Sequence, residues 1–104
     1  MDLNNIPVSA RPFIQRLAAL PQVERIVLFG SRAVGDNEPR ADIDLAISAP
    51  SLDRGQFAEL RVKAFEARTL YWLSLVHLEH TPDTLRQRIH QQGRVLHEHK
   101  TTTR

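Results

Sequence analysis

Hydrophobic positions in the first third of the chain follow two different spacings. Over residues 9–20 they recur every three to four positions, which predicts an amphipathic helix with Ser9 as its N-cap and Pro12 in its first turn. Residues 24–29 are instead a short apolar run of branched and aromatic side chains. This run stops at Gly30, so it predicts a strand that is buried on both faces.

The middle of the chain predicts a turn, a strand and a second amphipathic helix. Residues 33–40 gather glycine, aspartate, asparagine and proline, a composition typical of a turn between strands. Residues 42–48 form the next predicted strand, and Asp53 is placed to cap a helix over 53–68. The apolar positions of that helix, which we expect to face the core, are Phe57, Leu60, Ala64 and Phe65.

The last third predicts another strand, a helix and a short final strand. Residues 70–78 are apolar and aromatic, and they predict the third strand. Helical spacing then begins with Thr81 as the cap, Pro82 at the first helical position and Gly93 as the stop signal. Residues 94–98 predict an optional last strand. The fold class is therefore α/β (α+β), a small mixed sheet flanked by helices in the order α-β-β-α-β-α(-β).

Size and composition limit the number of domains and the compartment. A chain of 104 residues can build one modest core, so we expect a single domain over 1–98 followed by a flexible tail at 99–104. No apolar run approaches roughly 18 residues, so no membrane span is expected. The first residues lack the basic and apolar stretches of a secretory signal, which predicts a cytoplasmic protein.

The chain has no cysteine, which excludes disulfide frameworks, cysteine-ligated zinc and thiol nucleophiles. Its 14 basic and 12 acidic side chains give a net charge of only +2, which is too small to indicate direct nucleic-acid binding. An RNA-associated basic module is one functional hypothesis, but the sequence has no aromatic-basic motif of a known RNA-binding fold.

The predicted strand 42–48 begins with two aspartates in the stretch "ADIDLAIS". Side chains two residues apart on a strand point to the same face, so Asp42 and Asp44 project together. Two carboxylates roughly 4 Å apart repel by about 1 kcal/mol in water and about 4 kcal/mol in a partly shielded site, so a bound cation stabilises the pair. Mg²⁺ is the natural candidate because it takes one or two carboxylates and completes its coordination with water and substrate phosphates.

The Gly-Ser pair after the first predicted strand supplies groups for those phosphates. Gly30 allows the backbone to turn sharply and approach a ligand closely. The following amides and the Ser31 hydroxyl can donate to phosphate oxygens, and Arg32 adds a positive charge beside them. A phosphate cradle facing a carboxylate pair predicts metal-assisted nucleotidyl transfer. In the alternative interpretation, Gly30 and Ser31 simply form the turn that ends the strand, and Asp42 and Asp44 are solvated residues at the edge of a strand.

The stretch "GSRAVGDNEPRADIDLAI" resembles the signature of the minimal nucleotidyltransferases (MNT) of the polymerase-beta superfamily, and the resemblance extends over nearly the whole chain. It implies a polymerase-beta-like fold in which Gly30 and Ser31 hold the triphosphate of ATP while Asp42 and Asp44 bind Mg²⁺. MntA-like members are commonly antitoxins of HEPN/MNT toxin–antitoxin pairs. They are encoded beside a HEPN-type ribonuclease, and some transfer AMP from ATP to a tyrosine on it. The resemblance therefore implies such a partner.

The sequence departs from this pattern at the family's third aspartate, which lies on the third strand and serves as metal ligand and base. That position falls on Ser74, which carries no charge and cannot act as a base at neutral pH without help. Strand alternation places Ser74 on the face of Trp72 and Val76. His77 and Glu79 therefore point away, and they could replace the missing carboxylate only through a bulge.

Two functional hypotheses follow from this departure. The first is an Mg²⁺-dependent enzyme that transfers AMP from ATP to its partner through Asp42 and Asp44. The second is a catalytically weakened, nucleotide-binding antitoxin that neutralises its partner by binding, because base catalysis alone contributes roughly 100-fold to 10,000-fold. A transferase of this length has no separate substrate domain, so we expect a hetero-oligomer or at least a homodimer.

Other side chains with chemical potential have simpler interpretations. The histidines lack the spacing of a zinc site, so we expect surface or strand positions for His77, His80, His90, His97 and His99. Trp72 could stack on a base, but an aromatic side chain on a predicted strand more commonly belongs to the core. Several arginines could form a basic rim for a partner or simply a solvated face, namely Arg61, Arg68, Arg86, Arg88 and Arg94.

Overall fold

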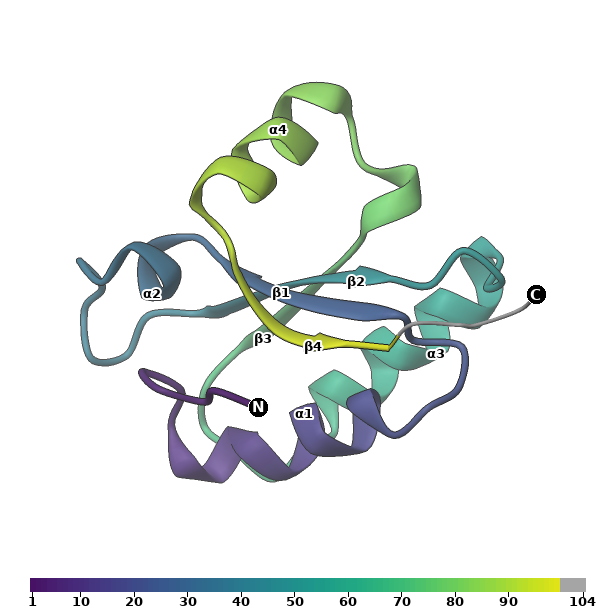
Figure 1. Ribbon diagram of the computed structural model, residues 1–104. Coiled ribbons are helices and arrows are strands. Elements are labelled where there is room, and N and C mark those ends of the chain that lie inside the picture. The colour runs from purple at the N-terminus through teal and green to yellow at the C-terminus, as the bar shows by residue number, and fades with distance from the viewer. Residues whose placement is uncertain (100–104) are drawn as a thin grey trace.

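The computed structural model describes residues 1–99, and its centre is a four-stranded sheet with the strand order β3-β2-β1-β4 (Figure 1). β2 and β3 run parallel, whereas β1 is antiparallel to both β2 and β4. The predicted mixed sheet is therefore confirmed, including its optional last strand. The strands are β1 Arg25–Phe29, β2 Ile43–Ser48, β3 Leu73–His77 and β4 Arg94–Glu98.

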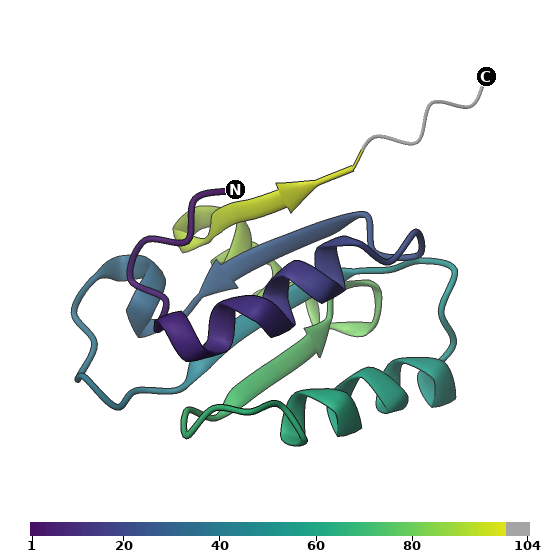
Figure 2. The same ribbon diagram turned by 90° about the horizontal axis from the view of Figure 1, so that it is seen from below.

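Helices cover both faces of the sheet, as the predicted α/β class requires. α1 and α3 lie on one face and α4 lies on the other (Figures 1 and 2). None of the helices within residues 1–99 is long and apolar enough to cross a membrane. The helices are α1 Arg11–Ala18, α2 Ser31–Val34, α3 Arg54–Phe65 and α4 Asp83–Gln92, with 3-10 turns at Val8–Ala10 and Leu78–His80.

The main core lies between the sheet and the helices α1 and α3. Ile26, Leu28 and Leu45 point into it from β1 and β2, and Phe13 and Leu17 contribute from α1. A smaller cluster lies between the sheet and α4, formed by Val27, Ala46, Leu78 and Ile89. Both faces of β1 are thus buried, as its continuous apolar run predicted.

One of the three predicted helix caps is confirmed and two are wrong. Asp53 caps α3 in a reciprocal capping box. Ser9 instead shares a hydrogen bond of 2.8 Å with the hydroxyl of Thr69, and a 3-10 turn delays the start of α1. The helix α4 begins at Asp83 after Pro82 and has no side-chain cap, and the hydroxyl of Thr81 instead donates to the carbonyl of His77 at 2.8 Å.

The segment between α3 and β3 differs most from the prediction. We expected Phe65 to face the core, but α3 ends at this residue and its ring is 74% exposed. The third strand begins only at Leu73, so Leu70 and Trp72 precede it and are also exposed. The chain leaves the helix at the edge of the sheet, and its apolar side chains there have no second layer to pack against.

The turn predicted over 33–40 begins later than expected, because its first two residues belong to the single-turn helix α2. At the C-terminal end of the described chain, the amide of His99, the first residue of the predicted tail, donates to the carbonyl of Glu24 at 2.7 Å. The rest of the predicted tail lies outside the described residues.

Candidate functional site

Gly30 ends β1 in a backbone conformation that favours glycine, with a φ of 74°. Ser31 then begins α2, which closes at Gly35 with a φ of 96°. The amides of Ser31 and Arg32 lie in the first turn of this helix, where amides have no intrahelical partner. The turn therefore presents a hydroxyl and free backbone donors directly after the strand.

The turn lies against Asp44 of the neighbouring strand. Phe29, the residue before Gly30, is the register partner of Asp44 in the antiparallel pair of β1 and β2. A Cβ atom added to Gly30 would overlap the Oδ2 atom of Asp44. The absence of a side chain at Gly30 is therefore what allows the turn and the carboxylate to meet.

Asp42 and Asp44 form a pair of carboxylates beside this turn. Asp42 is exposed immediately before β2, and Asp44 is partly buried within it. Burial raises the pKa of Asp44 above its ordinary value, and the negative charge of Asp42 raises it further. Within residues 1–99, neither carboxylate has an ion-pair partner. This donor set fits a hard divalent cation such as Mg²⁺, because two uncompensated carboxylates share one site.

Ser74 lies next to Asp44 on β3, whereas the Gly30 turn approaches Asp44 from β1. Ser74 and Asp44 are direct partners in the parallel register of β2 and β3. Ser74 is partly exposed. In the described part of the chain, no group of three or more His, Asp or Glu side chains is placed to hold a metal ion. The oxygen ligands gathered here are therefore two carboxylates and one hydroxyl.

His77 and Glu79 do not supply the missing carboxylate. The ring of His77 stacks on Phe57 at 4.2 Å, and its Nε2 lies 3.0 Å from the carbonyl oxygen of Ala49. Glu79 accepts hydrogen bonds from the hydroxyl of Ser48 at 2.6 Å and from the amide of Ala49 at 2.9 Å. The register of β2 and β3 continues without a bulge. His77 lies on the opposite face of β3 from Ser74, as strand alternation predicted, whereas Glu79 follows the strand in a 3-10 turn and binds Ser48 and Ala49 at the end of β2.

Arg32 does not lie where the sequence suggested. Its side chain is buried, and its guanidinium donates to the carbonyls of Ala41 (3.0 and 3.1 Å), Pro39 (2.9 Å) and Asn5 (3.2 Å). The expectation that this charge lies beside a phosphate is therefore corrected. Three carbonyls bind the guanidinium, and it holds in place the loop that leads to Asp42.

Asn5 is a positioning residue that the sequence analysis missed. Its backbone has a φ of 65°, which asparagine tolerates better than most residues. Its side-chain amide donates to the carbonyl of Arg32 and to the Oδ1 atom of Asn37, each at 2.8 Å. The N-terminal segment thus ties α2 to the loop that precedes Asp42. These partners lie about 30 residues away along the chain, so no local pattern reveals them.

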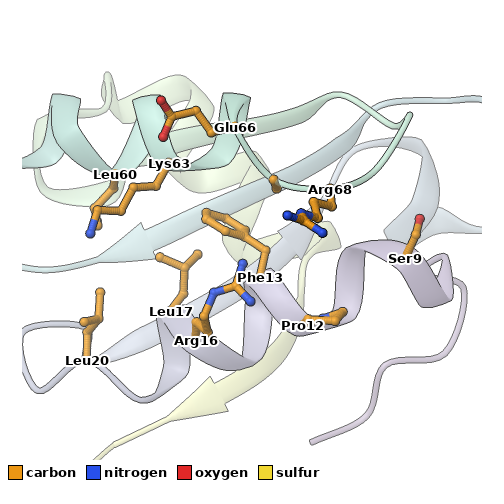
Figure 3. A pocket seen from close by; sticks show the side chains of 11 residues that line it. Ser9, Pro12, Phe13, Arg16, Leu17, Leu20, Leu60, Lys63, Glu66 and Arg68 are labelled. Atoms are coloured by element: carbon orange, nitrogen blue, oxygen red, sulfur yellow. The ribbon is translucent and has the colours of Figure 1, made fainter.

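A separate cavity of about 690 Å³ lies between α1 and α3 (Figure 3). Phe13, Leu17 and Leu60 form its apolar wall, and Arg16 and Lys63 lie at its rim. It is on the α1 and α3 side of the sheet, whereas strand alternation directs the carboxylates to the α4 side. None of the predicted site residues lines this cavity, so it is not part of the candidate site.

Three solved structures similar to this chain come from toxin–antitoxin systems. A chain in the crystal structure of a toxin–antitoxin with AMP-PNP is 32% identical, with a TM-score of 0.67, and the match covers 82% of this chain and 70% of that one. A chain of the toxin–antitoxin MntA-HpeT with two aspartates, two residues apart, replaced by glutamate is 27% identical, with a TM-score of 0.67 and coverage of 86% and 72%. A third, from MntA-HpeT with a tyrosine-to-alanine substitution, is 31% identical, with a TM-score of 0.64 and coverage of 83% and 70%.

The comparison with protein families identifies the chain more directly. A comparison with curated proteins found no match. The profile of the family described as Polymerase beta, Nucleotidyltransferase matches residues 13–102, a span that includes the Gly30 turn, both aspartates and Ser74. The chain therefore belongs to the polymerase beta nucleotidyltransferase family.

Proposed function

We propose that this protein is a nucleotide-binding antitoxin that neutralises a HEPN-type ribonuclease by binding it, with only weak AMP-transfer activity. The observation that carries this proposal is the pairing of Asp44 with Ser74 in a site that keeps the Gly30 turn and both aspartates. The similarity to chains of toxin–antitoxin structures, one of them with AMP-PNP, supports both the nucleotide and the partner.

The nucleotide in this proposal is ATP with Mg²⁺. The amides after Gly30 and the hydroxyl of Ser31 donate to phosphate oxygens, and Asp42 and Asp44 hold the metal. The bound ion would offset the negative charge of the phosphates and polarise the reacting phosphoryl group. The raised pKa of Asp44 supports the assignment, because it reflects a carboxylate whose charge lacks a stabilising partner in the protein.

Ser74 limits the chemistry that this site can perform. In AMP transfer, an acceptor oxygen on the partner forms a bond to the α-phosphorus of ATP, pyrophosphate leaves, and the acceptor's proton passes to a base. The Ser74 hydroxyl does not accept that proton at neutral pH, and the loss of a general base costs roughly 100-fold to 10,000-fold in rate. Nucleotide binding does not use the base, so we expect it to persist.

A second candidate function is catalytically competent AMP transfer to the partner. The specific observation in its favour is the intact pair of Asp42 and Asp44, which is the metal-binding part of the site. In this case the acceptor's proton passes to solvent, and Ser74 is a tolerated substitution.

One experiment separates the two candidates. The purified protein is incubated with the product of the neighbouring gene, Mg²⁺ and ATP, and the masses of both intact chains are measured together with ribonuclease activity. We expect a stable complex and loss of ribonuclease activity before AMP accumulates on the partner. Addition of one or more AMP masses to the partner as fast as inhibition develops would establish the second candidate instead. Absence of a complex would contradict the antitoxin function altogether.

A matched variant shows whether neutralisation needs the nucleotide site. Replacement of both carboxylates, Asp42→Asn with Asp44→Asn, should abolish Mg²⁺-dependent ATP binding and leave the complex and the neutralisation intact. If the double variant forms the complex but no longer inhibits the ribonuclease, inhibition depends on the nucleotide site and the simple binding mechanism is wrong.

A further inference from the structure

Three large apolar side chains are exposed together where α3 passes into β3. Phe65 is 74% exposed, Leu70 is 94% exposed and Trp72 is 58% exposed. The rings of Phe65 and Trp72 meet edge to face, with 5.9 Å between their centres. Clustered apolar side chains of this size on the surface of a small domain mark an interaction site, and tryptophan and phenylalanine are enriched at the centres of interfaces.

These side chains line a hollow of about 520 Å³ that also includes Ser74. We call this surface, lined by Phe65, Leu70, Trp72 and Ser74, the edge hollow. Ser74, the register partner of Asp44, is the residue that the edge hollow shares with the candidate site. Figure 2 shows the α3–β3 loop at the same end of the sheet as α2, the helix that follows the Gly30 turn. A protein seated in the edge hollow therefore contacts the candidate site at Ser74.

Arg61 gives the edge hollow its charge. It is the one charged side chain among the residues that line the hollow, and no carboxylate is among them. Its Nε donates to the carbonyl of Leu75 at 3.1 Å, and its guanidinium lies 4.8 Å from the centre of the Phe57 ring. Within residues 1–99, its two terminal amino groups have no hydrogen-bond partner. The surface thus combines apolar contact area with a guanidinium group whose terminal nitrogens can bind a carboxylate.

These contacts restrict what can occupy the edge hollow. β3 is an edge strand, but Arg61 already binds the outward carbonyl of Leu75, so addition of a further strand is blocked at that point. A second copy of this chain, related by a two-fold axis, would present the same lining, which has no carboxylate to pair with Arg61. The occupant that fits is a different protein with an apolar and acidic surface.

Resting on the proposed function, we propose that the edge hollow is the docking surface for the toxin partner. The partner inserts a helix or loop with a large apolar side chain that contacts Phe65, Leu70 and Trp72, and an adjacent carboxylate that pairs with Arg61. This placement sets the bound segment beside Ser74 and Asp44. It accounts for neutralisation by binding, and it would also present an acceptor hydroxyl to the nucleotide.

The first test uses the single tryptophan of the chain, Trp72, as a local probe. Biosynthetic incorporation of 5-fluorotryptophan gives one ¹⁹F resonance, which is then followed while the unlabelled neighbouring gene product is added. We expect the resonance to shift and to lose its sensitivity to the H₂O-to-D₂O exchange of the solvent as the indole is buried. An unchanged resonance in a sample that forms the complex, as measured by size-exclusion chromatography, would overturn the inference.

The second test is the substitution Leu70→Asp, with Val95→Asp as its matched control. Leu70 is almost fully exposed, so its replacement removes little packing, and Val95 is a half-exposed apolar residue on the opposite edge strand. We expect Leu70→Asp to weaken the complex at least about tenfold, while Val95→Asp leaves it unchanged. Binding of Mg²⁺ and ATP to each isolated variant, measured by calorimetry, shows that the fold and the nucleotide site remain intact.

The outcomes distinguish this inference from the function on which it rests. If both variants bind the partner as tightly as the wild type, the docking surface lies elsewhere, although the antitoxin function stands. If the isolated protein is a dimer that Leu70→Asp dissociates without affecting the partner, the edge hollow is a contact between copies and the inference is wrong. If the wild-type protein forms no complex, the proposed function fails, and the docking surface fails with it.

Discussion

Asp44 and Ser74 are direct neighbours in the parallel register of β2 and β3, and Gly30 packs against the same aspartate from the side of β1. Asp44 therefore lies between the turn that we propose to bind phosphates and the position where the resemblance to minimal nucleotidyltransferases implies a third carboxylate. Gly30 and Ser74 can be replaced separately, so their effects on nucleotide binding and on AMP transfer can be measured independently.

The substitution Ser74→Asp should restore the missing carboxylate. We expect tighter Mg²⁺ binding, because a third charge joins the pair, and AMP transfer to the partner that is faster by roughly 100-fold to 10,000-fold. Calorimetry with Mg²⁺ and time-resolved intact mass measurements would check the two effects. Ser74→Asn is the control, since it has nearly the same shape as aspartate without its charge. Equal transfer rates in both variants would show that the carboxylate at this position is not what limits transfer.

The substitution Gly30→Ala should disrupt the contact with Asp44. The added Cβ meets the carboxylate directly and also occupies a backbone conformation with positive φ, so we expect a loss of more than about 2 kcal/mol in the free energy of unfolding. Gly35→Ala is the control, because its φ is also positive but nothing lies within 4 Å of its Cβ. It should lose only about 1 kcal/mol and keep ATP binding. Urea unfolding and ATP titration would separate the variants, and equal effects would exclude a specific role for the Gly30 contact.

Arg32 should contribute to the site through the loop that it holds. Arg32→Lys keeps the charge but loses the fork that bonds Ala41 and Pro39, so we expect a loss of about 2 kcal/mol in stability and weaker Mg²⁺ and ATP binding. Arg40→Lys, an exposed position in the same loop, is the control and should change neither quantity. Retention of full stability in Arg32→Lys would mean that the guanidinium contacts do not hold the loop.

Asp44 should make the metal-free protein less stable as pH rises. Its pKa is raised on folding, so the folded state holds the proton more tightly than the unfolded state does, and the free energy of unfolding falls as pH increases from 3.8 to the raised value. The substitution Asp44→Asn removes this decrease in the free energy of unfolding, because asparagine does not ionise. At neutral pH the variant should be more stable than the wild type, by a small amount because Asp44 is only partly buried, and the gain should vanish below pH 3.8.

Added Mg²⁺ should reverse the order of stability at neutral pH, because only the wild type keeps both carboxylates of the pair. Thermal unfolding over a pH series, with and without Mg²⁺, measures both effects. Asp36→Asn, an exposed loop position, is the control and should show no difference that depends on pH or metal. A gain from Asp44→Asn that persists below pH 3.8 would point to a cause other than ionisation.

The order of helices and strands followed from local patterns, whereas the pairing of Asp44 with Ser74 is visible only in the structure. Strand periodicity placed Ser74 on the opposite face from His77, and the pattern of the Gly-Ser pair and two aspartates located the turn and the carboxylates. The failures concern side chains whose partners are distant in sequence or absent. Arg32 bonds Asn5 and the loop carbonyls, which no local spacing reveals, and Phe65 fits the core face of its helix by spacing although α3 ends there, beyond the edge of the sheet.

The residues that we propose to bind the nucleotide and the residue that we propose to limit the reaction belong to different parts of the chain. Gly30 and Asp44 sit within one antiparallel hairpin, whereas Ser74 reaches Asp44 only after the crossover through α3. Ser74 is partly exposed, so another polar side chain fits there without entering the core. If Ser74 limits transfer as we propose, one substitution on β3 separates an enzyme from a protein that only binds, and the sequence of the β1–β2 hairpin alone does not distinguish the two.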